Sequence, residues 1–185
     1  MLNNTIKKEL KIQKILPVFN TSNIINDIER LELYLSKNSN VKVIEVTLRS
    51  EDSFEIAKKL KENFPNIRFG LGSILHKNDY DKGIQHGFEF FVSPGIISDL
   101  SKNKTLDYIP GGETISEFLL LNSLGYEIIK FFPSNLSGGQ KKLLSIKNIL
   151  KEVSFIPTGG INYHNYLDYL SLENVLCVGM SQFDN

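Results

Sequence analysis

A lysine in the middle of an apolar run is the first residue of this chain that could do chemistry. The segment GYEIIKFFPSN alternates like a β-strand, in which Lys130 faces the same way as Ile128 and Phe132. Ile129 and Phe131 then face the opposite way. Burial disfavours the charged ammonium and favours a neutral, nucleophilic amine, which can form a Schiff base with a carbonyl compound. The alternative is a lysine that extends from the strand end to water.

The segment VKVIEVTLR predicts another strand, with polar residues on one of its faces. Glu45, Thr47 and Arg49 share that face and are expected to point into the interior. Ionised groups in an interior are costly unless they pair or act. Four residues along a strand span about 13 Å between Cα atoms, so a direct Glu45–Arg49 ion pair is strained. Each of the two residues therefore needs another partner or a ligand.

Lys130, Glu45 and Arg49 together are the residue types that a Schiff-base aldolase needs. Imine formation requires acid and base assistance, which a carboxyl group can provide. A 2-keto acid would offer Arg49 a carboxylate to bind, preferably in a bidentate manner. The Schiff base then accepts electrons when the bond between C3 and C4 breaks. These types indicate class I aldolase chemistry without specifying the substrate.

Two other functions stay open on these residues. A phosphosugar isomerase or epimerase on the same fold needs no imine, so the role of Lys130 decides between the two enzyme classes. A truncated, non-catalytic relic would bind a ligand or a partner without turnover.

Paired glycines lie at the carboxyl end of the seventh expected strand. Thr158, Gly159 and Gly160 lie there, and Ser181 ends the segment VGMS of the eighth. Glycines let backbone N–H groups approach an anion, and the loops after strands seven and eight are the usual phosphate site of a (β/α)8 barrel. The sequence therefore predicts phosphate binding at these residues.

A short helix and eight β-type runs separated by helical patterns account for most of the chain. Alternating β and α segments indicate a parallel sheet, and eight repeats favour a (β/α)8 TIM barrel over an open doubly wound sheet. Prolines and glycines cluster at the carboxyl ends of the runs, which share one face of such a barrel. The helix is expected at residues 4–14 and the strands at 15–20, 41–49, 67–73, 88–95, 106–112, 127–132, 154–160 and 174–181.

The composition argues against several classes of function. Lys plus Arg and Asp plus Glu are both 21, so no net field favours nucleic acid or an acidic membrane surface. No run approaches the roughly 18 apolar residues of a membrane helix, and the N-terminal segment lacks the apolar core of a signal peptide. The single cysteine, Cys177, fits a reducing cytosol, and the histidines lack metal-ligand spacing. Residues 1–185 are expected to form one domain.

The order of several short segments resembles the 2-keto-3-deoxy-6-phosphogluconate (KDPG) / 4-hydroxy-2-oxoglutarate (KHG) aldolase family. The resemblance covers nearly the whole chain, and EVTLR and KFFP are its most specific segments. In chain order, the segments are EVTLR, GLGS, SPG, IPG, KFFP, GG, PTGGI and VLCVG.

This resemblance implies a carbon–carbon lyase on a (β/α)8 barrel, a cytoplasmic homotrimer that needs no metal and no cofactor. The implied reaction is reversible cleavage of KDPG to pyruvate and glyceraldehyde 3-phosphate, or of KHG to pyruvate and glyoxylate. By similarity, Lys130 is the Schiff-base lysine and Glu45 is the general acid/base. The residues implied in substrate binding are Arg49, Ser73, Pro94, Thr158, Gly159, Gly160 and Ser181.

Three features depart from the family's pattern. Ser73 stands where the family usually has threonine, and it retains the hydroxyl. Met180 stands where a second glycine is common, and its bulk is expected to hinder backbone approach to a phosphate and to shift preference toward an unphosphorylated substrate. The chain ends at Asn185, where the family continues, so the last helix of the barrel is expected to be missing.

Overall fold

A computed structural model describes residues 2–102 and 107–181 as helices alternating with strands. The helices are α1 Asn4–Gln13, α2 Ile24–Lys37, α3 Ser53–Asn63, α4 Lys77–Gln85, α5 Ser98–Ser101, α6 Ile115–Ser123, α7 Gly139–Ile146 and α8 Tyr166–Leu170. The strands are β1 Ile15–Asn20, β2 Val43–Thr47, β3 Arg68–Gly72, β4 Phe90–Val92, β5 Tyr108–Ile109, β6 Gly111–Gly112, β7 Ile128–Phe131, β8 Ser154–Pro157 and β9 Val178–Met180.

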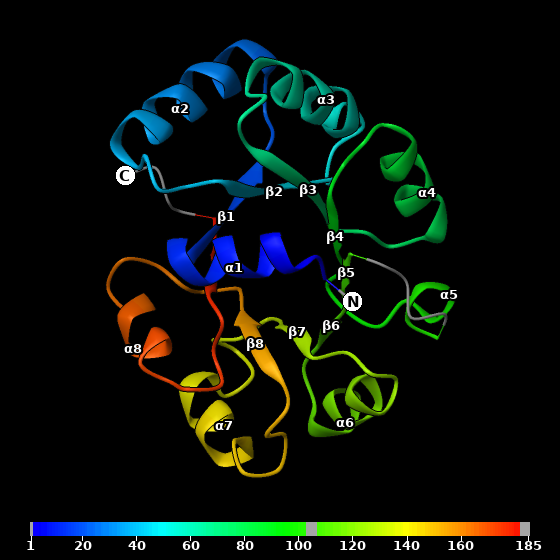
Figure 1. Ribbon diagram of the computed structural model, residues 1–185, viewed down its shortest axis with the longest axis vertical. Coiled ribbons are helices and arrows are strands. Elements are labelled where there is room, and N and C mark those ends of the chain that lie inside the picture. The colour runs from blue at the N-terminus through cyan, green and yellow to red at the C-terminus, as the bar shows by residue number, and fades with distance from the viewer. Residues whose placement is uncertain (1, 103–106, 182–185) are drawn as a thin grey trace.

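The strands form two parallel sheets. One has six strands in the order β5-β4-β3-β2-β1-β9, and the other has three in the order β6-β7-β8. Isolated parallel bridges join Phe155 to Val175 and Thr158 to Gly179. The strands curve round a common centre, which α1 crosses, and the other helices lie outside the strands (Figure 1). The predicted α/β fold with parallel strands is therefore confirmed.

The strand expected at residues 106–112 is divided between the two sheets. Tyr108–Ile109 pairs with β4, whereas Gly111–Gly112 pairs with β7. The break falls at Pro110, which has no N–H to donate to a ladder. Its carbonyl still accepts a hydrogen bond from Lys130 N at 2.9 Å. Leu106, the expected first residue of this strand, lies outside the described residues.

Two apolar clusters lie on opposite faces of the strands. We call the first the inner cluster, since both sheets and α1 contribute to it: Ile6, Leu10, Leu16, Val43, Phe90, Val92, Ile109, Ile128, Ile156 and Cys177. The outer cluster lies between the strands and the surrounding helices and includes Ile44, Val46, Ile129, Phe131, Val178 and Met180. The alternation predicted for the strands at 41–49 and 127–132 is thus confirmed at their apolar positions.

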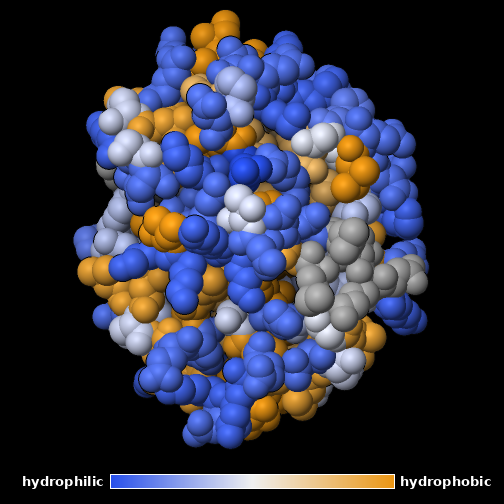
Figure 2. Space-filling view, in the orientation of Figure 1, coloured by the Kyte–Doolittle hydropathy of each residue, from blue (hydrophilic) through white to orange (hydrophobic). Residues whose placement is uncertain are grey.

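Helix α1 covers the amino-terminal ends of the strands. The Gln13 amide accepts from Val43 N at 3.1 Å and donates to Val43 O at 2.8 Å, at the start of β2. Glu9 accepts a hydrogen bond from Arg68, at the start of β3, at 2.9 Å. The surface over α1, at the centre of Figure 2, is mostly hydrophilic, while its buried side adds Ile6 and Leu10 to the inner cluster.

Helix α6 begins with a capping box formed by Thr114 and Glu117. The Thr114 hydroxyl accepts from Glu117 N, and the Glu117 carboxylate accepts from Thr114 N at 2.7 Å. This reciprocal arrangement satisfies two N–H groups that have no partner inside the helix.

Among the helices of residues 2–102 and 107–181, none is both long enough and apolar enough to cross a bilayer. The expected absence of a last helix concerns the chain after Ser181, which lies outside the described residues.

Replacing Leu10 with alanine is expected to lower the free energy of unfolding by ~2–5 kcal/mol, because it opens a cavity in the inner cluster. Leu10 is 0% exposed, whereas Ile12 on the same helix is 60% exposed. The control Ile12→Ala is expected to change the free energy of unfolding by less than ~0.5 kcal/mol. Equilibrium urea denaturation measures both values, and equal values would contradict a packing role for α1.

Candidate active site

Lys130 and Glu45 meet in the interior although 85 positions separate them in the chain. Lys130 lies on β7 in the three-stranded sheet, and Glu45 lies on β2 in the six-stranded sheet. Lys130 Nζ is 3.3 Å from Glu45 Oε1, and the two side chains are 5% and 1% exposed. Lys130 therefore does not extend to water, and a carboxylate lies within hydrogen-bonding distance of its amine.

Gly72 on β3 leaves the space that the Glu45 carboxylate occupies. This residue pairs with Thr47 of the neighbouring strand β2. A Cβ at position 72 would overlap Glu45 Oε1 and would lie 2.7 Å from Glu45 Cγ. A side chain at this position would therefore displace the carboxylate from Lys130.

A pocket of about 390 Å³ opens above the Lys130 amine, at the carboxyl ends of the strands. It brings together four of the residues expected in the site, namely Arg49, Ser73, Pro94 and Lys130. Leu48, Leu75 and Phe132 complete the lining. Phe132 could have been found by sequence alternation, because it shares a strand face with Lys130. No comparable signal marks Leu48 or Leu75.

The sequence predicted Arg49 on the interior face of a strand. This prediction is wrong. Strand β2 ends at Thr47, and Arg49 is exposed in the segment that follows it. Arg49 Nε donates to Ser73 Oγ at 3.2 Å. Ser73 has a φ of 59°, so its backbone is left-handed where the chain leaves β3. The guanidinium therefore lies at the rim of the pocket, where a ligand can reach it without the cost of burying a free cation.

The predicted phosphate loop lies beside the lysine pocket without lining it. Gly159 and Gly160 have φ values of 94° and 76°, and Thr158 forms a bridge with Gly179 that brings the loops after β8 and β9 together. Ser181 is exposed at the end of β9.

Phe132 connects the loop to the lysine. Lys130 Nζ is 5.4 Å from the centroid of the Phe132 ring. A Cβ at Gly159 would lie 3.2 Å from the same ring. The lysine pocket and the glycine loop are therefore neighbours across one aromatic side chain.

Met180 and Cys177 both have buried side chains near the end of the chain. Met180 is 0% exposed and packs in the outer cluster, so its bulk points away from the loops where it was expected to hinder a phosphate. Cys177 is a core residue within the inner cluster. Burial, followed by the negative charge of Glu45, raises the pKa of the Cys177 thiol.

Within residues 2–102 and 107–181, no group of three or more His, Cys, Asp or Glu side chains is arranged to hold a metal ion.

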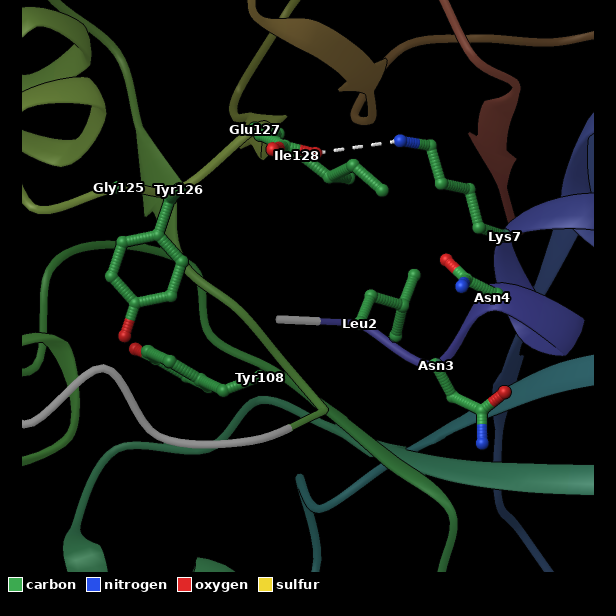
Figure 3. A pocket seen from close by; sticks show the side chains of 9 residues that line it. All are labelled: Leu2, Asn3, Asn4, Lys7, Tyr108, Gly125, Tyr126, Glu127 and Ile128. Carbon is green, nitrogen blue, oxygen red and sulfur yellow. Dashed lines mark ion pairs between the residues drawn. The ribbon is translucent and has the colours of Figure 1, made fainter.

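A separate pocket of about 260 Å³ lies at the other end of the strands, between α1 and residues 125–128 (Figure 3). An ion pair at 3.5 Å joins Lys7 to Glu127 on one side, and the rings of Tyr108 and Tyr126 lie on another. None of the residues predicted for the site lines this pocket.

Comparisons with known proteins place this geometry in a family. A family model described as KDPG and KHG aldolase matches residues 6–185. The KHG/KDPG aldolase of Escherichia coli K12 is 38% identical over 144 residues, which cover 76% of this chain and 68% of that protein. The 2-dehydro-3-deoxy-phosphogluconate aldolase of Zymomonas mobilis is 33% identical over 179 residues, which cover 95% and 85%.

A solved structure of KDPG aldolase from Legionella pneumophila superposes with a TM-score of 0.87 at 31% identity, covering 95% of this chain and 85% of that one. That structure holds pyruvate as a covalent carbinolamine intermediate. The match of the family model over nearly the whole chain, with these relatives, establishes that the chain belongs to the KDPG and KHG aldolase family.

Proposed function

We propose that this protein is a class I aldolase that cleaves KDPG to pyruvate and glyceraldehyde 3-phosphate through a Schiff base on Lys130. The observation that carries the proposal is the buried contact of 3.3 Å between Lys130 Nζ and Glu45 Oε1 beneath an open pocket. Relatives named as aldolases for KDPG and for KHG support the same reaction, and KHG is proposed as a second substrate. An isomerase or epimerase would need no such amine.

The amine of Lys130 attacks the C2 carbonyl of the keto acid, and the resulting carbinolamine loses water to form an iminium. The electron pair of the C3–C4 bond then moves toward the iminium nitrogen as the C4 hydroxyl loses its proton and an aldehyde leaves. The remaining enamine is protonated at C3, and hydrolysis returns pyruvate and the free amine. Glu45 is the group placed to take and return these protons, because it already contacts the reacting nitrogen.

The rim residues suit the two ends of the substrate. Arg49, with Ser73 hydrogen-bonded to it, is proposed to bind the keto acid carboxylate, and Pro94 forms the adjoining wall. Thr158 is proposed to contact the pyruvyl group. The phosphate is proposed to bind at Gly159, Gly160 and Ser181, and the outward-packed Met180 side chain leaves that loop open.

We also propose a fuller architecture than two sheets. The isolated bridges between β8 and the β9 segment, and an inner cluster shared by both sheets, support closure into a (β/α)8 barrel that forms one domain.

We further propose a cytoplasmic homotrimer. Leu119 and Leu120 on α6 are 46% and 48% exposed and offer apolar surface for a subunit contact. Sedimentation equilibrium tests the trimer.

Incubation with pyruvate and sodium borohydride is expected to leave a reduced pyruvate adduct on Lys130, because hydride makes the imine irreversible. Peptide mapping by mass spectrometry locates the adduct. Lys142 is an internal control, since its Nζ lies near the same strand, 5.3 Å from the Phe131 ring, and outside the pocket. An adduct on Lys142, or none on Lys130, would contradict the proposal.

Gly72→Ala is expected to lower kcat for KDPG cleavage by about 100-fold, because the methyl group displaces the Glu45 carboxylate from the reacting nitrogen. The matched control is Gly70→Ala on the same strand, where a Cβ would overlap the ring of Phe90 instead. That control is expected to lower the melting temperature and to keep kcat in the folded protein. Steady-state kinetics and thermal melts separate the two, and an unchanged kcat for Gly72→Ala would overturn the role of Glu45.

A further inference from the structure

The Ser93 hydroxyl lies where the two sheets meet beside the active site. Ser93 follows β4 of the six-stranded sheet and is 0% exposed. Its Oγ is 2.5 Å from Gly95 O, 2.6 Å from the Tyr108 hydroxyl and 3.3 Å from Gly111 N. Gly111 is the first residue of β6 in the three-stranded sheet. One buried hydroxyl therefore links both sheets.

A count of protons gives each of these hydrogen bonds a direction. A serine hydroxyl has one proton to donate and two lone pairs to accept with. Gly95 O can only accept, so Ser93 donates to it. The N–H of Gly111 and the hydroxyl of Tyr108 must then both donate to Ser93. All three hydrogen-bonding capacities of Ser93 are filled, and the set is complete only while Tyr108 supplies its proton.

Tyr108 is held in the form that this arrangement requires. Its side chain is 1% exposed, and burial raises the pKa of the phenol although the hydrogen bond with Ser93 lowers it. The net shift is upward, so Tyr108 is protonated at neutral pH and remains a donor.

The groups joined by Ser93 border the reacting lysine. Gly111 pairs with Lys130 in the β6–β7 ladder. A Cβ at Gly111 would overlap the carbonyl group of Pro94, so the main chain of Pro94 rests directly on Gly111. Pro94 in turn lines the pocket of Lys130. A shift of the Ser93 hydrogen bonds therefore moves both the wall of the pocket and the strand that carries the amine.

The position of this link gives it a role in the geometry of the site. Glu45, Arg49 and Ser73 come with the six-stranded sheet, whereas Lys130 comes with the three-stranded sheet. The one N–H proton of Gly111 is shared between two acceptors in the turn after β4, Ser93 Oγ at 3.3 Å and Gly95 O at 3.4 Å. The chain itself crosses at Pro110, which cannot donate a hydrogen bond.

We infer that Ser93 and Tyr108 are positioning residues of this enzyme, whose hydrogen-bonded link across the two sheets sets the place of Lys130 and Pro94 relative to Glu45. The inference rests on the proposed aldolase function and adds to it two residues that do not touch the substrate. Neither residue is needed to form the imine chemically, and both are needed to hold the amine where the imine forms fastest.

Tyr108→Phe tests the inference, with Tyr126→Phe as its matched control. The two rings pack edge to face with centroids 6.0 Å apart. The Tyr126 hydroxyl is also buried, and it donates at 3.2 Å to the carbonyls of Leu100 and Ser101 rather than to Ser93. Each substitution removes one buried phenol hydroxyl and keeps the ring, so their costs in stability are comparable.

In kinetics well below the melting temperature, Tyr108→Phe is expected to lower kcat and the rate of borohydride-trapped imine formation by about tenfold, with KM changed by less than about twofold. Ser93→Ala removes the other partner of this hydrogen bond, and it is expected to have the same effects on kcat, trapping rate and KM. Tyr126→Phe is expected to keep the parent kcat and trapping rate at a similar loss of melting temperature.

Parent-like kcat and trapping rates in both Tyr108→Phe and Ser93→Ala would overturn the inference and leave the aldolase function intact. The same would follow if Tyr126→Phe lost as much kcat as Tyr108→Phe, because the effect would then be one of general stability. A parent protein that neither cleaves KDPG nor traps pyruvate would overturn the proposed function, and the positioning role with it.

Discussion

The buried contact between Lys130 and Glu45 is the interaction on which the rest of this structure depends. Moving an ion from water into a protein interior costs several kcal/mol, and attraction between partners offsets that cost only when their geometry is good. A pair of apolar side chains would fill the same space with less difficulty. Placing the pair under an open pocket therefore makes sense for chemistry rather than for stability.

The residues on either side of that pair differ in polarity and exposure. The inner cluster and α1 close the amino-terminal ends of the strands, which keeps water from reaching the pair from that side. Arg49, by contrast, lies exposed at the rim of the pocket, where its charge remains hydrated. The Lys130 amine is thus shielded by protein on most sides and accessible from the pocket, which suits its proposed role as a nucleophile.

Much of the fold and part of the site could be predicted from residue patterns. Period-two alternation placed Lys130 and Glu45 on interior faces correctly, because strand geometry alone fixes the side to which a residue points. Alternation could not show where a strand stops, so Arg49 was assigned to an interior face two positions beyond the end of β2.

Long-range geometry accounts for the other differences. Pro110 looked like a strand end, whereas it divides one expected strand between two sheets. Met180 looked like an obstacle to phosphate because sequence comparison shows which residue changes and not which way it faces; its side chain packs among the outer helices. The arrangement of the two sheets that brings Glu45 of β2 to Lys130 of β7 depends on the curvature of all the strands and leaves no local signal in the sequence.

Gly72 has a consequence for how this chain can vary. Its backbone is an ordinary strand conformation, so glycine is not needed there for flexibility, and the space it leaves is filled by a functional group from β2. Positions 72 and 45 are therefore epistatic: a larger residue at 72 becomes acceptable only after residue 45 has been shortened, and that step removes the carboxylate. A lineage that retains Glu45 is confined to glycine at 72, whereas one that has lost Glu45 is free to fill the space and gain stability.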